Sequence, residues 1–170
     1  MKEDTSKVSK EELDLRYRFC TPWSKMVRRS IVTDNNIEFD ETYVANDVCF
    51  AAKTGYWAKK IEAFDEVMYC ITSGDDSLTV SADINRMLQR AEVSIDRYNF
   101  LKEHLPSCDF ERLHVTGKSA VSEALFGCKS PVTAFKIWRM YKDAGIGTFY
   151  LKDLKEDLGY VVRRLRIGNG

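Results

Sequence analysis

Two stretches of the chain repeat apolar residues with the period of an α-helix, and this pattern constrains the fold more than any other feature. In residues 47–72 the repeat is four, three, four and three positions: Trp57, Ile61, Phe64, Met68 and Ile71. In residues 81–104 the same spacing joins Ile84, Leu88, Ala91, Ile95, Tyr98 and Leu101. Each set would line one helix face, and "TSGDDSLTV" between them is typical of a turn. We therefore predict an antiparallel helical hairpin over residues 47–104 as the spine of a mainly α fold.

Start and stop signals predict shorter helices on both sides of this hairpin. Ser9 with a glutamate three residues later forms a capping box, which predicts a helix to about residue 19. Thr21-Pro22 and Ser130-Pro131 each pair an N-cap residue with a proline suited to the first helical turn. They predict helices over residues 22–32 and 131–143, the second ended by Gly145. A further short helix is expected over residues 118–126.

Two segments have the composition of β-strands. Residues 37–44, "IEFDETYV", alternate in part, and residues 160–167, "YVVRRLRI", are rich in β-branched side chains. A lone strand cannot form a sheet, so the first would need a partner elsewhere. The second segment fits a strand or the start of a helix. We expect a minor β element at most.

The length of 170 residues fits a single domain, with a frayed tail over residues 1–8 and a basic helical unit over residues 116–170. At 44% hydrophobic residues, the composition excludes a disordered chain. No apolar run is long enough for a membrane helix, and residues 1–15 lack the apolar core of a secretory signal. Five widely spaced cysteines without a CxxC motif predict free thiols. These features predict a cytoplasmic protein without membrane contact.

The C-terminal region is the leading candidate for function. Residues 129–170 hold nine Lys/Arg and four Asp/Glu, although the formal net charge of the whole chain is zero. A helix, a turn at Gly145, a short helix over residues 151–158 and a basic segment follow in the order of a helix-turn-helix with a wing. The predicted phosphate contacts are Lys152, Lys155, Arg163, Arg164 and Arg166. The large Tyr141 and three carboxylates in residues 153–157 count against this interpretation.

A second basic patch lies near the N-terminus. Trp23 is followed by Lys25, Arg28 and Arg29, and on a helix Lys25 and Arg29 would share a face. Interleaved aromatic and cationic residues suit contact with single-stranded nucleic acid. The alternative is that Trp23 and Met26 belong to the core and that the arginines face water or the acidic stretch of residues 34–47.

The hypothesis is therefore a small, non-enzymatic regulatory protein that contacts nucleic acid. Its close rival is a protein-interaction module, such as an adaptor, inhibitor or assembly subunit. This module would use exposed aromatic residues, such as Tyr56, Trp57 and Tyr98, or the acidic stretch of residues 34–47. The oligomeric state is left open.

We predict no catalytic residues and no cofactor, because no motif that carries chemistry is complete. "TGKS" at residues 116–119 resembles the end of a phosphate-binding loop, but Arg112 stands where that loop needs glycine. His104, Cys108, His114 and Cys128 are of the types that bind zinc, but their spacing matches no familiar finger. The ordinary alternative is a buried cysteine beside partly exposed histidines, and we assign no metal.

Overall fold

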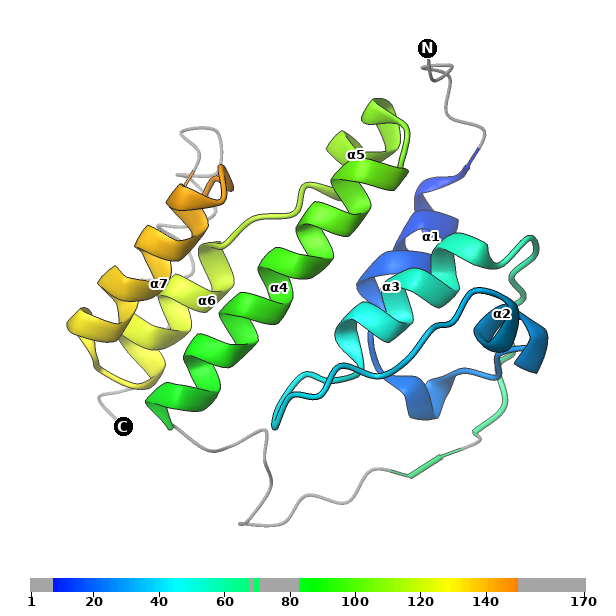
Figure 1. Cartoon of the computed structure of the whole chain (residues 1–170), viewed down its shortest axis with the longest axis horizontal. Helices are drawn as coiled ribbons and strands as arrows, with labels where there is room; N and C mark the ends of the chain where they lie inside the picture. Colours follow the sequence, from blue (N-terminus) through cyan, green and yellow to red (C-terminus); the bar gives the residue numbers. More distant parts are fainter. Residues whose placement is uncertain (1–7, 68, 71–82, 150–170) are drawn as a thin grey trace. The chain divides into compact units, whose positions relative to one another are not determined.

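The computed structural model describes residues 8–67, 69–70 and 83–149, and it is mainly helical (Figure 1). The chain divides into two compact units, Met1–Val115 and Thr116–Gly170. The first unit contains α1 (Lys10–Leu13), the π-helical turn η1 (Asp14–Arg18), the 3-10 turn η2 (Pro22–Ser24), α2 (Arg29–Asp34), α3 (Val48–Trp57), α4 (Ile84–His104) and α5 (Ser107–Leu113). The second contains α6 (Lys118–Ser122), the π-helical turn η3 (Glu123–Gly127) and α7 (Pro131–Asp143).

Several helix ends lie where the sequence predicts them. The Ser9 hydroxyl accepts the N–H of Glu12 at 3.1 Å, which satisfies an otherwise unpaired donor of the first turn of α1. Ser130 caps α7 in the same way, and the φ of Gly145 is +71°, in the left-handed region that follows many helices. Asp83 caps α4 by accepting the N–H of Asn85 at 2.7 Å. Local cap chemistry therefore determines these boundaries.

The core of the first unit forms where η1, α3, α4 and α5 meet. Its buried apolar cluster draws on all of these elements: Leu13, Tyr17, Ala52, Leu101, Leu105 and Leu113. Leu101 is fully buried. Of the stripe predicted for α4, Ala91, Tyr98 and Leu101 are buried, but Ile84 is 46% exposed. The helix is therefore confirmed, although its buried face is only partly the predicted one.

α3 and α4 pack side by side and run in the same direction (Figure 1). The Cys49 thiol, near the start of α3, donates to the Val93 carbonyl at 3.8 Å. Tyr56, near its end, meets the rings of Phe100 and His104 edge-on, with centroids 5.8 and 5.2 Å apart. The start of α3 thus contacts the middle of α4, and the end of α3 contacts the end of α4, which is the order of a parallel pair. The predicted antiparallel hairpin over residues 47–104 is therefore wrong, because α3 and α4 are parallel.

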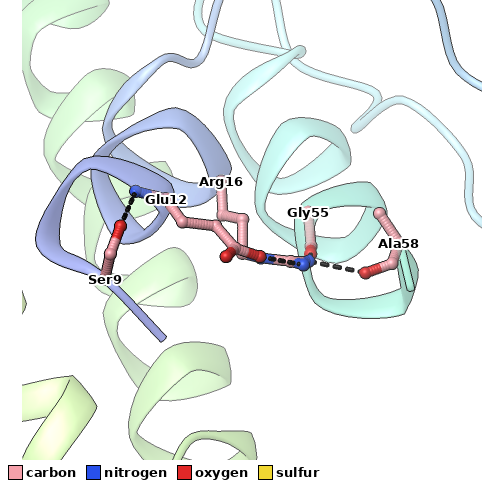
Figure 2. A network of polar contacts seen from close by, with 5 residues as sticks. All are labelled: Ser9, Glu12, Arg16, Gly55 and Ala58. Carbon is pink, nitrogen blue, oxygen red and sulfur yellow. Dashed lines mark hydrogen bonds and ion pairs between the residues drawn. The ribbon is translucent and has the colours of Figure 1, made fainter. Parts of the chain in front are cut away.

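The predicted helix over residues 47–72 is also too long, since α3 ends at Trp57 and residues 58–67 are not helical. Figure 2 shows the cause. The buried guanidinium of Arg16 donates to the carbonyls of Gly55 and Ala58, at 2.6 Å each. It also holds the Glu12 carboxylate, with Nε–Oε1 at 2.8 Å. A cation from η1 therefore satisfies the carbonyls that end α3.

Close packing makes this contact possible. A Cβ at Gly55 would lie 2.4 Å from the Arg16 carbonyl oxygen, so only glycine lets η1 approach α3 this closely. Beyond the helix, Phe64 of the predicted stripe is 66% exposed and Ile61 is half-buried, while the neighbouring Val67 is 94% exposed. Met68 and Ile71 of the stripe lie outside the described residues. The described part of the stripe is therefore not a buried helix face.

Residues 37–44 are not a strand, and the structure has no strand among the residues that it describes. Ile37 and Val44 are buried although strand alternation would place them on opposite faces, and Phe39 is 48% exposed. The Asp40 N–H bonds the Asn46 carbonyl at 3.0 Å, and the Val44 N–H bonds the side-chain oxygen of Gln89 at 3.1 Å. The segment is a loop that packs on α4, because no neighbouring strand accepts its backbone groups. The other predicted strand, over residues 160–167, lies outside the described residues.

In the second unit, α6 and η3 pack against α7. Its buried residues include Val121 and Ala124 on one side and Ala134, Ile137 and Tyr141 on α7. The Gly117 N–H bonds the Gly147 carbonyl at 3.0 Å, and a Cβ on Gly117 would lie 2.5 Å from the Tyr141 ring. The glycine of "TGKS" therefore gives room to a buried tyrosine, which is a packing role.

Candidate binding surfaces

The predicted phosphate contacts of the C-terminal unit lie outside the described residues: Lys152, Lys155, Arg163, Arg164 and Arg166. The same is true of the predicted helix over residues 151–158. The helix-turn-helix-like arrangement therefore stays a prediction. Its first helix, α7, does lie within the described part of the chain.

The second basic patch is not the predicted helix face. η2 ends after one turn, the backbone at Lys25 and Arg28 is extended, and α2 begins only at Arg29. Within η2 the Ser24 hydroxyl donates to the Thr21 carbonyl at 3.1 Å, and such local bonds compete with continuation of a helix. The predicted continuous helix is therefore wrong, and Lys25 and Arg29 do not share a helix face.

Lys25 is engaged with its own segment. Its ammonium group donates to the Phe19 carbonyl, and burial lowers its pKa below the ordinary value for lysine, against weaker opposing effects of Cys20 and Asp47. Arg28 and Arg29 are exposed. The patch therefore offers two arginines rather than three cations.

Trp23, its stacking partner Tyr69 and two apolar side chains of the segment around Trp23 are exposed. It is 47% exposed and stacks on Tyr69, with ring centroids 6.3 Å apart and planes 29° apart. Phe19 and Met26 in the same segment are 55% and 80% exposed. We call these four residues the apolar patch: Phe19, Trp23, Met26 and Tyr69. Trp23 is thus not a core residue.

The aromatic residues proposed for a protein-interaction module differ in exposure. Tyr98 is only 9% exposed and packs its ring edge-on against Phe110, at 5.1 Å between centroids. Tyr56 is half-buried against α4. Only Trp57 is exposed. The prediction that Tyr98 is exposed is wrong, because it lies on the core face of α4.

The acidic stretch of residues 34–47 is partly surface and partly interior. Asp34, Glu38 and Glu41 are exposed, whereas Asp40 is half-buried. Burial, together with the nearby negative charge of Asp40, raises the pKa of the Cys49 thiol to about 12. Because its pKa is raised, the Cys49 thiol beside Asp40 is inert rather than nucleophilic.

α7 has one face that serves the core and another that is exposed. Its buried residues are Thr133, Ala134, Ile137 and Tyr141. The outward arc carries Val132, Phe135, Lys136, Arg139 and Lys142, all exposed. The Phe135 and Trp138 rings stack with centroids 5.5 Å apart and planes 30° apart. The Lys142 ammonium group lies 5.0 Å from the centre of the Trp138 ring. We call the outward arc, with Trp138, the α7 face.

Three aromatic residues lie along α7 in the sequence: Phe135, Trp138 and Tyr141. Of the three, only Tyr141 is in the core. The signal that distinguishes them is the spacing of Lys136, Arg139 and Lys142 at steps of three, which marks the outward side of a helix. Phe135 lies within this cationic arc, whereas Tyr141 lies opposite it.

The division into units coincides with a division of charge. The unit Thr116–Gly170 contains ten Lys/Arg and five Asp/Glu, a net charge of +5. The unit Met1–Val115 contains the remaining sixteen Lys/Arg and twenty-one Asp/Glu, a net charge of −5. A zero total thus conceals one basic and one acidic unit.

A hollow of about 430 Å³ opens at the start of α4, and polar groups line it: Tyr43, Asp83, Asn85, Arg86 and Gln89. These groups already have partners. The Arg86 guanidinium lies 5.0 Å from the Tyr43 ring centre, Asp83 caps α4, and Gln89 binds the loop backbone. The contacts of these lining side chains attach the loop of residues 37–46 to α4, so we assign them a structural role.

Among the residues that the structure describes, no three His, Cys, Asp or Glu side chains are placed to hold a metal ion. His104 stacks on Phe100, with centroids 4.2 Å apart, and its Nδ1 bonds the Phe100 carbonyl at 2.8 Å. This histidine therefore belongs to an aromatic cluster with Tyr56.

Comparison with known proteins places the chain in no group, since no family model, curated protein or solved structure matches it. Searching the described helices for a segment both long and apolar enough to cross a membrane finds none. The function is therefore inferred from the binding surfaces of the structure alone.

Proposed function

We propose that this chain is a non-enzymatic regulatory protein that binds nucleic acid through its basic unit, residues 116–170. The observation that carries the proposal is the α7 face, where Lys136, Arg139 and Lys142 project on the exposed side of a helix. Asp143 is the one carboxylate within α7, and it lies 3.7 Å from Arg139. Nucleic-acid affinity comes largely from lysine and arginine contacts with phosphates. The net charge of +5 in this unit favours an anionic partner.

Fluorescence polarisation of the full chain with generic duplex and single-stranded probes, at about 50 and 200 mM salt, tests this proposal. Binding should weaken steeply with salt. The double variant Lys136→Gln/Arg139→Gln should bind less tightly and show a salt slope reduced by roughly one to two. Arg163→Ala/Arg164→Ala should have a similar effect if the predicted tail contacts are made.

The matched control is Lys59→Gln/Lys60→Gln, which removes two exposed cations from the acidic unit. It should leave affinity and salt slope near those of the wild type. If this control loses as much affinity as Lys136→Gln/Arg139→Gln, binding depends only on the total charge of the chain. Absence of binding to every probe at the lower salt concentration would refute the proposal.

A second candidate function is docking of a protein partner on the apolar patch. Trp23 and Tyr69 stack on one another at the surface, and Phe19 and Met26 expose further apolar area in the segment around Trp23. Exposed apolar patches mark interaction surfaces more often than single exposed residues do. The neighbouring Arg28 and Arg29 favour a partner segment with both apolar and acidic side chains. Met26→Gln, at a side chain 80% exposed, should abolish capture of such a partner, whereas Val132→Gln on α7, 68% exposed, should not. Equal capture by both variants would contradict this candidate.

A further inference from the structure

From the α7 face we infer a more specific ligand than nucleic acid in general: a single strand whose base stacks on Phe135 and whose phosphates contact the adjacent cations. This inference rests on the proposed function and specifies its ligand. It depends on the exposure and the mutual contacts of the rings and cations, all within one helix of one unit (yellow to orange in Figure 1).

Phe135 is available to stack because the fold does not use its outer side. Its side chain is 60% exposed, whereas the core of the unit uses Ala134, Ile137 and Tyr141. Its inner side rests on Trp138, at 5.5 Å between centroids. Trp138 is itself half-buried and has the Lys142 ammonium group over its ring. The stack thus supports Phe135 from behind and leaves it open to a further planar ring.

The cations of the α7 face lie near Phe135, where the sugar-phosphate backbone of a strand would pass if one of its bases stacked on the Phe135 ring. Arg139 is four residues after Phe135, so the two occupy one stripe, about 6 Å apart along the axis. Lys136 is the residue after Phe135 in the sequence. The Lys142 ammonium group lies over the Trp138 ring, and this contact holds it near the Phe135–Trp138 stack. The Arg139–Asp143 pair is more than 70% exposed on the arginine side, and such pairs are weak, so a phosphate can replace the carboxylate.

A single strand fits this arrangement better than a duplex or an acidic peptide. In a duplex both faces of each internal base are covered by neighbouring base pairs, so Phe135 would meet only the sugar-phosphate backbone. An acidic peptide would complement the cations but would have no planar group for the rings. Stacking of bases on aromatic side chains beside cations is the usual basis of single-strand binding without sequence preference.

Phe135→Leu tests the inference in the full chain, because it removes the ring and keeps an apolar side chain at an exposed site. Its affinity for a fluorescent oligothymidine of about twenty nucleotides should fall roughly tenfold, the loss typical of one stacked base. Phe135→Tyr, which keeps the ring, should bind like the wild type. Phe126→Leu is the matched control, since Phe126 is an exposed phenylalanine of the same unit outside α7.

Two further probes separate stacking from charge. Inorganic polyphosphate and polyglutamate are polyanions without bases, so Phe135→Leu should bind them as the wild type does. Wild-type affinity should also be higher for oligothymidine than for a duplex of equal length. Circular dichroism of each variant verifies that α7 is intact.

The outcomes distinguish this inference from the proposed function. If Phe135→Leu binds oligothymidine like the wild type while Lys136→Gln/Arg139→Gln does not, the stacking site is refuted and nucleic-acid binding stands. If polyglutamate binds as tightly as oligothymidine and Phe135→Leu has no effect, an acidic protein segment replaces the strand as ligand. If the wild type binds no nucleic acid, the proposed function itself fails.

Discussion

Replacing Arg16 with methionine should destabilise the first unit by about 3 kcal/mol. Arg16 is 8% exposed and its guanidinium donates to two carbonyls at the end of α3, those of Gly55 and Ala58. Methionine keeps much of the apolar stem but donates no hydrogen bond. The Gly55 carbonyl is buried and would lose its charged donor, which costs about 1–3 kcal/mol, and the part-buried Ala58 carbonyl about 1 kcal/mol more.

Glu12 adds little to this estimate. Its side chain is 38% exposed, so water can solvate the carboxylate when Arg16 is gone. Glu12→Gln should therefore cost about 1 kcal/mol or less, while Arg16→Lys, with one ammonium group in place of a fork, should cost an intermediate amount. This order of the three variants distinguishes the stabilisation by the two hydrogen bonds to the Gly55 and Ala58 carbonyls from that by the ion pair with Glu12.

Urea unfolding followed by circular dichroism measures these differences. With a slope of about 2 kcal/mol per molar urea, 3 kcal/mol lowers the midpoint by about 1.5 M. Arg28→Met is the matched control, because Arg28 is exposed in the same unit and should give no shift. If Arg16→Met costs less than about 1 kcal/mol, water replaces the guanidinium, and the explanation of where α3 ends is wrong.

Two further predictions concern packing and pH. Gly117→Ala should destabilise the second unit by about 1–3 kcal/mol in thermal unfolding, because its Cβ would lie 2.5 Å from the Tyr141 ring; an unchanged midpoint would contradict the observed packing. Burial raises the pKa of Tyr17 from 10.0 and that of Cys49 from 9.0, each to about 12. The unfolded chain loses these protons first, so the free energy of unfolding should fall as pH rises from about 9 to 12. At pH 8 a thiol reagent should label the exposed Cys70 quickly and Cys49 only on unfolding; equal labelling rates would show that Cys49 is accessible.

The starts of α1 and α7 were predictable because their causes are local. The capping residues Ser9 and Ser130 act through hydrogen bonds to N–H groups three residues away. Gly145 has the left-handed backbone that a helix end favours. Each of these boundaries depends on chemistry within one turn of the chain, so a short window of sequence is enough to recognise it.

The end of α3 was not predictable in this way, because its cause is distant in sequence. Arg16 reaches carbonyls about forty residues further along the chain, and the close approach depends on Gly55. The buried face of α3 consists of small residues, such as Ala51 and Ala52, which produce a weak periodic signal. The larger residues of 57–71 produce a stronger one, yet Trp57 and Phe64 among them are exposed. Apolar spacing alone cannot distinguish these cases.

The candidate sites also include features that the sequence could predict and features that it could not. Lys25 donates to the Phe19 carbonyl because a turn folds its ammonium group back onto that residue, and the sequence pattern does not contain this contact. The outward position of Phe135 follows from which face of α7 meets α6, a matter of tertiary packing. The surplus of positive charge after residue 116 was visible in the sequence, because it is a property of composition alone.

The inner and outer faces of α7 differ in how far packing constrains their side chains, and this difference supports the proposed binding function of the outer face. Gly117 and Tyr141 fit together on the inner side, and Ile137 is fully buried there, so substitutions on that side are constrained by packing. The outer side has no such constraint, and exposed helix positions tolerate lysine or glutamate equally well. A stacked Phe135–Trp138 pair among three cations is therefore not required by the fold, since a polar side chain at Phe135 would serve the helix as well. A ligand that uses both the ring and the charges accounts for the combination, and the Phe135→Leu and Phe135→Tyr variants separate that ligand from a simple polyanion.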